Sequence, residues 1–337
     1  MFEVISSDKP EKWNEIVRSM KNGDFYHLAE YHQLDDSGTP LLLYYSKNTD
    51  AFVLPVILRS IEGTPFCDIT SVYGYAGPLT NQDNPDRESV AAFQKELLHF
   101  FDANQVVSVF ARLHSLIINQ TFLLNGLGEL LDENLTVGID LTLPEEKQMK
   151  QYSRSLRYRI NHLKKIGVSV IQASNKEEID TFIALYEESM KRVNASKTYF
   201  FSREYFYRFL EKIDSVILLA VYEHEIIAGA LCTFCGNNMQ YHLGGTRNDF
   251  LFMSPLKLVL DRARCEGIAR GMKMLHLGGG KGGLNDSLFV FKSRFSNRRF
   301  VFKTWRYIHN KAVYDMLIYD KYKENKPEIT FFPLYRA

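Results

Sequence analysis

Apolar residues recur along the first half of the chain with two different periods. Segment 83–102 repeats them at helical spacing, which predicts an amphipathic helix. Segments 41–45 and 51–61 are apolar runs separated by a polar turn, and 105–112 and 135–141 alternate apolar with polar residues. These four segments predict strands. The first half is therefore expected to be mixed α/β, with strands on one side and one longer helix against them.

The second half begins with a basic segment, 144–167, that has Pro and two Glu at its start and two Lys and Gly at its end, which predicts one long helix. A three-strand meander follows later and leads into a helix that Ser254 and Pro255 are expected to start. The further predicted helices are 177–193, 202–213, 256–270, 291–295 and 311–324, and the predicted strands are 168–172, 216–222, 226–235, 239–243, 272–277, 299–308 and 329–335. This order resembles that of a GNAT-type acyltransferase domain, and the first half looks like a degenerate version of it.

Charge divides the chain more sharply than its net value of +1 suggests. Residues 1–145 hold 9 Lys and Arg against 21 Asp and Glu, whereas residues 146–337 hold 32 against 19. The basic half is suited to an anionic ligand such as a nucleotide or RNA, although opposite charges also help two domains to dock. With 337 residues and 45% hydrophobic composition, the chain is long enough for about two domains.

Three features of the sequence bear on where in the cell the protein is expected. The N-terminus carries charges and no apolar core, so we expect no secretory signal. No run of about 20 apolar residues occurs, so we expect no transmembrane segment. The four cysteines are few and irregularly spaced, which favours a reduced, cytoplasmic setting and no metal site.

Two stretches carry candidate chemistry. In 276–295, glycines after an apolar strand offer bare backbone N–H groups, with a basic rim, which favours binding of a phosphate or donor group; a basic-rimmed loop without ligand is the alternative. In 241–257, Arg247 stands where a GNAT domain has its pyrophosphate loop, but bulky residues replace the small ones expected there. His242, at the end of a central strand, is either a base or a structural histidine. The expected phosphate- or donor-binding residues are Arg247, Gly279, Gly280, Lys281, Gly282 and Ser287.

The ordered set of segments 73–80 (YGYAGPLT), 155–170, 186–206, 241–245 (YHLGG) and 275–295 resembles the FemABX peptidyltransferase family within the GNAT superfamily. The resemblance implies an α/β fold with two tandem GNAT-like domains. We expect a degenerate acidic domain over 1–143, a basic and active domain over 144–325, and a last strand in 326–337 that returns to the first domain.

The resemblance also implies functional residues. Lys292 matches a lysine near the family's reaction centre, and with His242 and Tyr241 it forms the expected catalytic set. Lys292 is expected to act electrostatically and not as a nucleophile. The expected substrate-binding residues are Arg157, Arg192, Lys197, Tyr73 and Tyr75.

These observations lead to one leading hypothesis and two rivals. The leading hypothesis is a cytoplasmic transferase that moves an acyl or aminoacyl group onto an amine of a peptidoglycan or glycan precursor, itself nucleotide- or lipid-linked. No cofactor is expected to bind tightly, with acyl-CoA or aminoacyl-tRNA as co-substrate and no DNA partner. The rivals are an acyl-CoA-dependent N-acetyltransferase of an amino sugar or small amine, and a non-catalytic scaffold that binds an anion or glycan.

Overall fold

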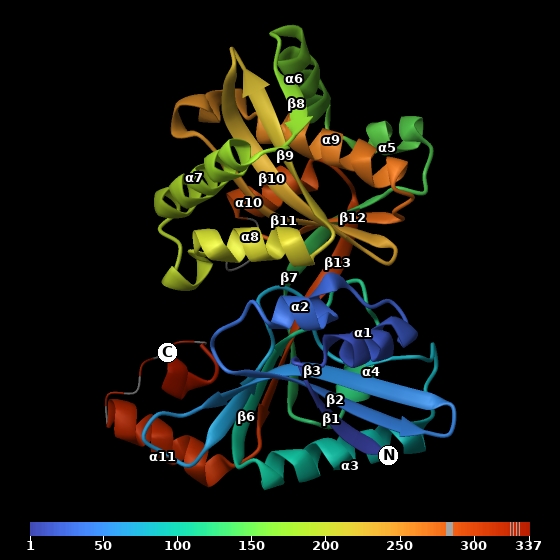
Figure 1. Cartoon of the computed structure of the whole chain (residues 1–337), viewed down its shortest axis with the longest axis vertical. Coiled ribbons are helices and arrows are strands. Elements are labelled where there is room, and N and C mark those ends of the chain that lie inside the picture. The colour runs from blue at the N-terminus through green and yellow to red at the C-terminus, as the bar shows by residue number, and fades with distance from the viewer. Residues whose placement is uncertain (281–285, 324, 326, 328, 330) are drawn as a thin grey trace. The chain divides into compact units, whose positions relative to one another are not determined.

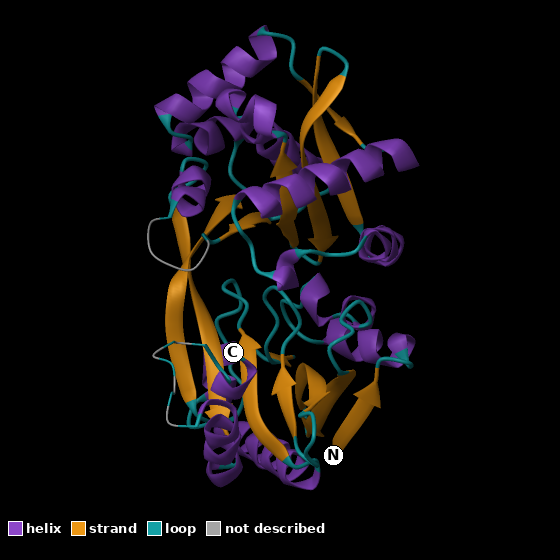
Figure 2. Ribbon diagram, turned by 90° about the vertical axis from the view of Figure 1, so that its left-hand side faces the viewer, coloured by secondary structure: helices purple, strands orange, loops and turns teal. Residues whose placement is uncertain are grey.

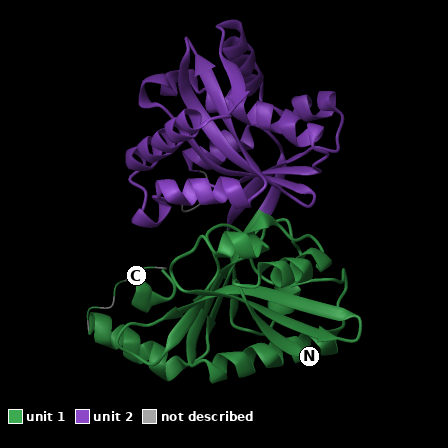
Figure 3. Cartoon of the chain, viewed as in Figure 1, with its two compact units in different colours: residues 1–133, 301–337 green, residues 134–300 purple. Residues whose placement is uncertain are grey.

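The chain forms two compact units in this computed structural model, which describes residues 1–280, 286–323, 325, 327, 329 and 331–337. Unit 1 consists of Met1–Glu133 with Val301–Ala337, and unit 2 of Asn134–Phe300 (Figure 3). These units differ from the expected division at 143/144 and 325/326. The reason is that the chain leaves and re-enters unit 1 inside two long strands, β7 (Glu129–Asp140) and β13 (Arg298–Ile308).

Unit 1 is built on a mixed sheet (Figure 1). Adjacent strands are antiparallel except for the parallel pair β4–β6. The strand order is β1 (Phe2–Ser6), β2 (Thr39–Lys47), β3 (Asp50–Ser60), β4 (Cys67–Thr70), β6 (Val106–Arg112) and β13, and the short β5 (Leu79–Thr80) pairs with β3. The helices are α1 (Pro10–Ser19), η1 (Phe25–His27), α2 (Ala29–His32), α3 (Arg87–Ala103), α4 (Gln120–Leu124), α11 (Lys311–Tyr322) and η4 (Leu334–Arg336).

Two apolar clusters cover opposite faces of this sheet. The predicted amphipathic helix is α3, which Asp86 caps, and its Phe93 stacks on Phe52 of β3 at 5.2 Å between ring centroids. On the other face, α1 contributes Trp13 and Val17 to a second cluster. Because side chains alternate across a strand, neighbouring residues of β2 and β3 serve the two clusters in turn.

The C-terminal segment folds differently from its prediction. The strand expected over 329–335 is wrong for the described residues, which end in the short helix η4. Leu334 and Tyr335 instead pack against α11 and β6 in an apolar cluster of unit 1. The buried carboxylate of Asp68 accepts hydrogen bonds from the Tyr335 hydroxyl at 3.1 Å and from Arg336 Nε at 2.8 Å, which fixes this segment on unit 1.

Unit 2 contains a six-strand sheet with helices on both faces (Figure 2). The strand order is β7, β12 (Met274–Gly278), β11 (Asn238–Thr246), β10 (Glu225–Cys235), β9 (Ser215–Tyr222) and β8 (Ser169–Gln172). Only β11 and β12 are parallel among the pairs in this unit's described strands. The helices are α5 (Glu145–Gln151), α6 (Arg154–Lys165), α7 (Lys176–Arg192), η2 (Lys197–Tyr199), α8 (Arg203–Lys212), η3 (Asn248–Met253), α9 (Leu256–Ala269) and α10 (Ser287–Ser293).

The two faces of this sheet carry different helices. Apolar side chains of α6, α9 and α10 share one core with strand residues such as Met239 and Leu275. On the opposite face α7 packs so closely that a Cβ on Gly229 would meet the ring of Phe182, and one on Gly245 would meet the backbone of Leu185. Small residues at these two strand positions therefore let α7 approach the sheet.

The basic segment expected to form one helix over 144–167 is interrupted. Tyr152 adopts an extended conformation between α5 and α6, and Ser153 caps α6 by accepting a hydrogen bond from the Leu156 backbone at 3.2 Å. Burial of the Tyr152 ring explains the break, because its hydroxyl reaches Asp261 of α9 at 3.1 Å.

Candidate functional site

Strands β11 and β12 separate in the middle of unit 2. In the described part of the chain they pair only over Asn238–Gln240 and Met274–His276, although β11 continues to Thr246 and β12 to Gly278. Beyond the last pair, the described residues of β11 and β12 form no further ladder with each other. The parallel ladder between the two strands is therefore confined to three residue pairs.

A bulge lies directly after this split. The register between β10 and β11 passes from Cys232 opposite Tyr241 to Leu231 opposite Leu243, so His242 is the extra residue. A bulge re-aims side chains and interrupts the ladder. Because side chains alternate across a strand, Tyr241 packs with the α9 and α10 core, whereas His242 lies on the α8 side of the sheet.

Lys292 lies beside the split on the Tyr241 side. Its Nζ donates a hydrogen bond to the carbonyl oxygen of Gly279 at 2.7 Å and lies 5.5 Å from the centre of the Tyr241 ring. The side chain is 7% exposed, and this burial lowers the pKa of Lys292 to about 7, with Asp286 opposing the shift. The ammonium is therefore held at the end of β12 with only partial compensation of its charge.

The start of α10 fixes this lysine. Asp286 caps the helix by accepting a hydrogen bond from the Phe289 backbone at 2.6 Å. A Cβ on Gly280 would collide with the Asp286 carboxylate, so only glycine allows this approach. Ser287 is exposed at the first turn. Lys281 and Gly282 lie outside the described residues.

His242 is held by α8 and not by Lys292. Its ring stacks on Phe209 with centroids 5.1 Å apart and planes at 13°, and its Nε2 lies 3.4 Å from the Tyr205 hydroxyl. The three expected catalytic residues therefore divide between the two faces of the sheet. Lys292 and Tyr241 lie on one face and His242 on the other, with the β11 backbone between them.

The expected binding residues are more scattered. Arg157 and Lys197 are exposed. Arg192 donates hydrogen bonds to the Thr246 carbonyl at 3.0 Å and to Asn248 Oδ1 at 2.6 Å, so it ties α7 to the end of β11.

Arg247 and the two tyrosines have local partners as well. Arg247 pairs with Glu225 at 2.5 Å and lies over the Phe250 ring. In unit 1, the carbonyl of Tyr73 accepts a hydrogen bond from the Tyr31 hydroxyl, and the Tyr75 ring contacts Phe302. The binding roles expected of these residues stay predictions.

Comparisons with known proteins bear on the fold. Residues 150–286 match a family model described as an acetyltransferase (GNAT) domain. A crystal structure of FemX is similar with a TM-score of 0.73 at 15% identity, covering 94% of this chain and 99% of that one. The chain has a GNAT-like fold. The identity to FemX is low enough that this likeness concerns the fold alone.

Two further solved structures have related folds. The L-PGS structure from Bacillus licheniformis gives a TM-score of 0.57 at 13% identity, covering 90% of this chain and 93% of that one. A tandem GNAT protein from the clavulanic acid biosynthesis pathway gives 0.51 at 9% identity, covering 91% and 98%. The tandem protein fits the mixed α/β organisation of this chain as two GNAT-like domains. A search of curated proteins finds no significant match.

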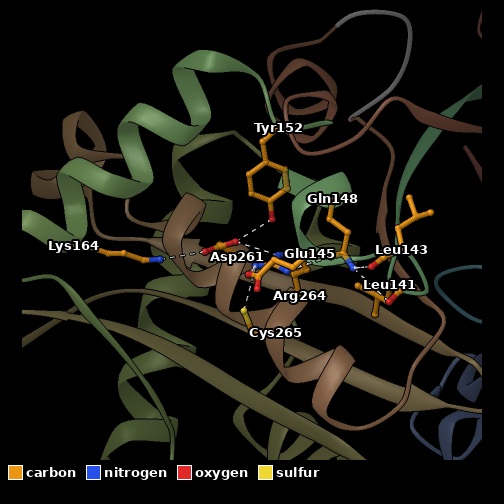
Figure 4. A network of polar contacts seen from close by, with 9 residues as sticks. All are labelled: Leu141, Leu143, Glu145, Gln148, Tyr152, Lys164, Asp261, Arg264 and Cys265. Atoms are coloured by element: carbon orange, nitrogen blue, oxygen red, sulfur yellow. Dashed lines mark hydrogen bonds and ion pairs between the residues drawn. The ribbon is translucent and has the colours of Figure 1, made fainter. Parts of the chain in front are cut away.

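Within the GNAT-like unit 2, a buried polar network fixes α9 against α5 and α6 (Figure 4). Arg264 is 2% exposed and donates to Asp261 at 3.2 Å, to Gln148 at 3.2 Å and to Glu145 at 3.0 Å. Burial and the Asp261 carboxylate raise the pKa of Tyr152, which keeps the Tyr152 hydroxyl neutral. This network replaces water around a buried cation and so holds the helix that follows β11.

Sequence reasoning missed the α8 side of the GNAT-like site. Tyr205 and Phe209 are spaced four residues apart, and that spacing indicates only one helix face. A second missed feature is the buried pair at the point where the strands separate, where His276 Nδ1 lies 2.7 Å from Gln240 Oε1. No sequence signal joins these two residues, because their pairing depends on strand register.

No group of three or more His, Cys, Asp or Glu is arranged to hold a metal ion within the described chain. Among the described helices, none combines the length and the apolar character needed to cross a membrane.

Proposed function

We propose that this protein is an acyltransferase that moves an activated acyl or aminoacyl group onto an amine of a cell-envelope precursor. The observation that carries the proposal is the buried Lys292 ammonium at the split between β11 and β12. The split offers room for backbone contacts to a donor carbonyl, and the lysine supplies positive charge there. Both are what acyl transfer to an amine requires.

The proposed reaction divides the two faces of the sheet between donor and acceptor. The acceptor amine enters from the His242 side and attacks the donor carbonyl, which forms a C–N bond and a tetrahedral oxyanion. Backbone N–H groups of β11 and the Lys292 ammonium stabilise that oxyanion. Collapse of the intermediate breaks the carbonyl bond to the donor oxygen or sulfur. The proton lost by the amine passes through His242 or the acceptor itself to the leaving group.

Two donor classes fit this chemistry. The fold similarity to FemX and L-PGS supports an aminoacyl ester, such as aminoacyl-tRNA. The family match to an acetyltransferase domain supports an acyl-CoA thioester. Bulky residues of η3, including Phe250 and Phe252, occupy the stretch before α9, and this favours the aminoacyl ester. Both donors are made in the cytoplasm, where we propose that the reaction takes place without a tightly bound cofactor.

The remaining expected residues keep more limited roles in this proposal. Tyr241 positions the Lys292 ammonium through its ring, and Gly279 orients it through its carbonyl. Arg192 preserves the end of β11 and does not contact the acceptor directly. We propose Arg157 as a donor-side residue because it is exposed on α6.

The test compares the wild-type protein with Lys292→Ala and with Lys150→Ala, whose parent lysine is exposed and paired with Glu146. Each is incubated with a nucleotide-linked peptide precursor and either aminoacyl-tRNA or acetyl-CoA, and product mass is measured. We expect transfer by wild type and by Lys150→Ala, and a loss of at least about 100-fold in Lys292→Ala. Full turnover by Lys292→Ala removes the assignment of Lys292. Absence of transfer from every donor, with retained precursor binding, favours a non-catalytic scaffold.

A further inference from the structure

A buried polar pair marks the level at which β11 and β12 separate. Gln240 and His276 form the last residue pair of the parallel ladder between these two strands. His276 Nδ1 donates a hydrogen bond to Gln240 Oε1 at 2.7 Å, and the exposed fractions of His276 and Gln240 are 0% and 1%. We name these two residues the fork pair. Their side chains therefore join the strands at the point where the backbone ladder ends.

Both strands bulge directly after the fork pair. In β11 the extra residue is His242, on the edge that pairs with β10. In β12 the register against β7 shifts between His276 and Gly278, so Leu277 is the extra residue there. A bulge bends the strand that contains it and increases the local twist. Each strand therefore changes direction within two residues of the fork pair, and each bulge lies on the edge away from the split.

The fork pair is a polar pair in apolar surroundings. Met239 and Leu275, one residue before each member, belong to the core on the α9 face, so the fork pair lies on the opposite face. On that face Phe182, Phe206 and Phe209 of α7 and α8 are fully buried. Replacing both members of a buried hydrogen-bonded pair by apolar groups of the same shape is often neutral for stability or favourable. Stability alone therefore does not explain a glutamine and a histidine at these positions.

A hydrogen bond adds direction to such a contact. The bond of the fork pair forms in one register only, because a slip of either strand by one residue turns its side chain to the other face. Gly279 follows three residues after His276, and its carbonyl accepts the hydrogen bond of Lys292 at 2.7 Å. Tyr241 follows Gln240 directly, and its ring centre lies 5.5 Å from Lys292 Nζ. Both contacts of the Lys292 ammonium therefore depend on where the strands separate.

We propose that Gln240 and His276 are positioning residues of the transfer reaction. The fork pair sets the point of strand separation and so places the β11 backbone and the Lys292 ammonium against the donor carbonyl. It acts through these groups and neither contacts the substrates nor takes a proton from the acceptor amine. This inference rests on the proposed function, since the reaction that the fork pair serves is the one proposed above.

The first measurement is kcat and KM for transfer from aminoacyl-tRNA or acetyl-CoA to a nucleotide-linked peptide precursor. Gln240→Leu removes the acceptor oxygen from His276, whereas His276→Gln still offers an N–H to Gln240. We expect Gln240→Leu to lower kcat at least about 10-fold and to change KM for the precursor by less than about 3-fold. The reason is that misplaced groups weaken contacts to the transition state and not the binding of substrate. We expect His276→Gln to keep kcat within about 3-fold of wild type.

A double variant tests whether the two residues act as a unit. Gln240→Leu/His276→Leu is expected to lower kcat by no more than Gln240→Leu alone, because the two side chains share one hydrogen bond. Effects of Gln240→Leu and His276→Leu that multiply in the double variant contradict a shared role. A loss of kcat in His276→Gln as large as in Gln240→Leu also overturns the proposal, since the imidazole itself and not the hydrogen bond would then be required.

The matched control removes a buried hydrogen bond far along the chain from the fork pair. Tyr335→Phe, in unit 1, deletes a hydroxyl that lies 2.8 Å from Ser108 Oγ and donates to Asp68 at 3.1 Å. It is expected to lower the urea midpoint, as Gln240→Leu does, with an unchanged kcat. Equal losses of kcat in Tyr335→Phe and Gln240→Leu overturn the proposal, because reduced stability would then explain both.

The second measurement is amide hydrogen exchange and needs no substrate. It follows residues 238–242 and 274–279 by mass spectrometry under native conditions. We expect these amides to exchange at least about 10-fold faster in Gln240→Leu than in wild type, because the end of the ladder opens more often. His276→Gln is expected to exchange at the wild-type rate. Unchanged exchange in Gln240→Leu overturns the proposal.

The two measurements separate the fork pair from the proposed function. If Gln240→Leu exchanges faster but keeps the wild-type kcat, the positioning role fails and the proposed function stands. If wild type transfers from neither donor, the proposed function fails. Faster exchange in Gln240→Leu then still supports the fork pair as the feature that sets the separation of β11 and β12.

Discussion

Replacing Lys292 by methionine is expected to remove activity and to change how stability depends on pH. Methionine has a similar length and no charge, so it fills the space beside Tyr241 without the ammonium. In the folded protein, burial lowers the pKa of Lys292 from its ordinary value of 10.5 to about 7. The unfolded chain therefore retains this proton over a pH range in which the folded chain has released it.

The direction and size of the change in unfolding free energy with pH follow from the protons bound by the folded and unfolded states. Between about pH 7 and pH 10.5 the unfolded state binds more protons, so the free energy of unfolding rises with pH. A shift of this size corresponds to about 5 kcal/mol of destabilisation when both states are protonated, at about 1.4 kcal/mol for each pKa unit. About 2 kcal/mol of this destabilisation remains at about pH 9. The free energy of unfolding of the wild type therefore rises by about 2.5 kcal/mol between about pH 6 and pH 9 because of Lys292.

The assay is urea unfolding of wild type, Lys292→Met and the exposed control Lys150→Met at about pH 6, 7, 8 and 9. The free energy of unfolding of Lys292→Met relative to wild type is expected to fall by about 2.5 kcal/mol across this range. Lys150→Met is expected to track wild type. A difference between Lys292→Met and wild type that stays constant with pH would refute the claim that burial lowers the lysine pKa.

Three further outcomes are expected. His32 is buried and its pKa is lowered to about 4, so the wild type should lose stability as pH falls from about 6.5 to 4, and His32→Leu should flatten that decline in thermal unfolding curves. In Gly244→Ala the new Cβ collides with the Tyr241 hydroxyl, so transfer should fall at least about 10-fold with little change in precursor affinity. Asp68→Asn leaves Arg336 without its buried carboxylate and should lower the free energy of unfolding by about 3 kcal/mol in urea titrations; a change below about 1 kcal/mol contradicts that role.

Much of the secondary structure was predictable because one face of each element is buried. Helix α3 and the meander β9, β10 and β11 follow the expected segments closely. The break at Tyr152 was not predictable, since the segment reads as a continuous helix and only the buried contact with Asp261 interrupts it. A strand was expected at the C-terminus, but its apolar residues Leu334 and Tyr335 lie in η4 and pack against α11.

The candidate site was predictable in part. The family resemblance named Lys292, and the structure adds Asp286 as the cap of the helix that carries it. The sequence did not indicate the bulge at His242, because a bulge depends on strand register and leaves no compositional sign. The sequence also did not indicate that Arg192 donates to backbone and side-chain oxygens at the end of β11, and its role toward a substrate stays a prediction.

The discontinuity of unit 1 has a consequence for synthesis on the ribosome. Its sheet requires β13, and its α11 cluster requires residues near the end of the chain, whereas all of unit 2 lies between those parts. A nascent chain emerging from the exit tunnel can complete unit 2 while β6 still lacks its neighbour. Unit 1 is thus the first to be translated and the last to be completed. The unpaired edge of β6 needs shielding until β13 has been translated.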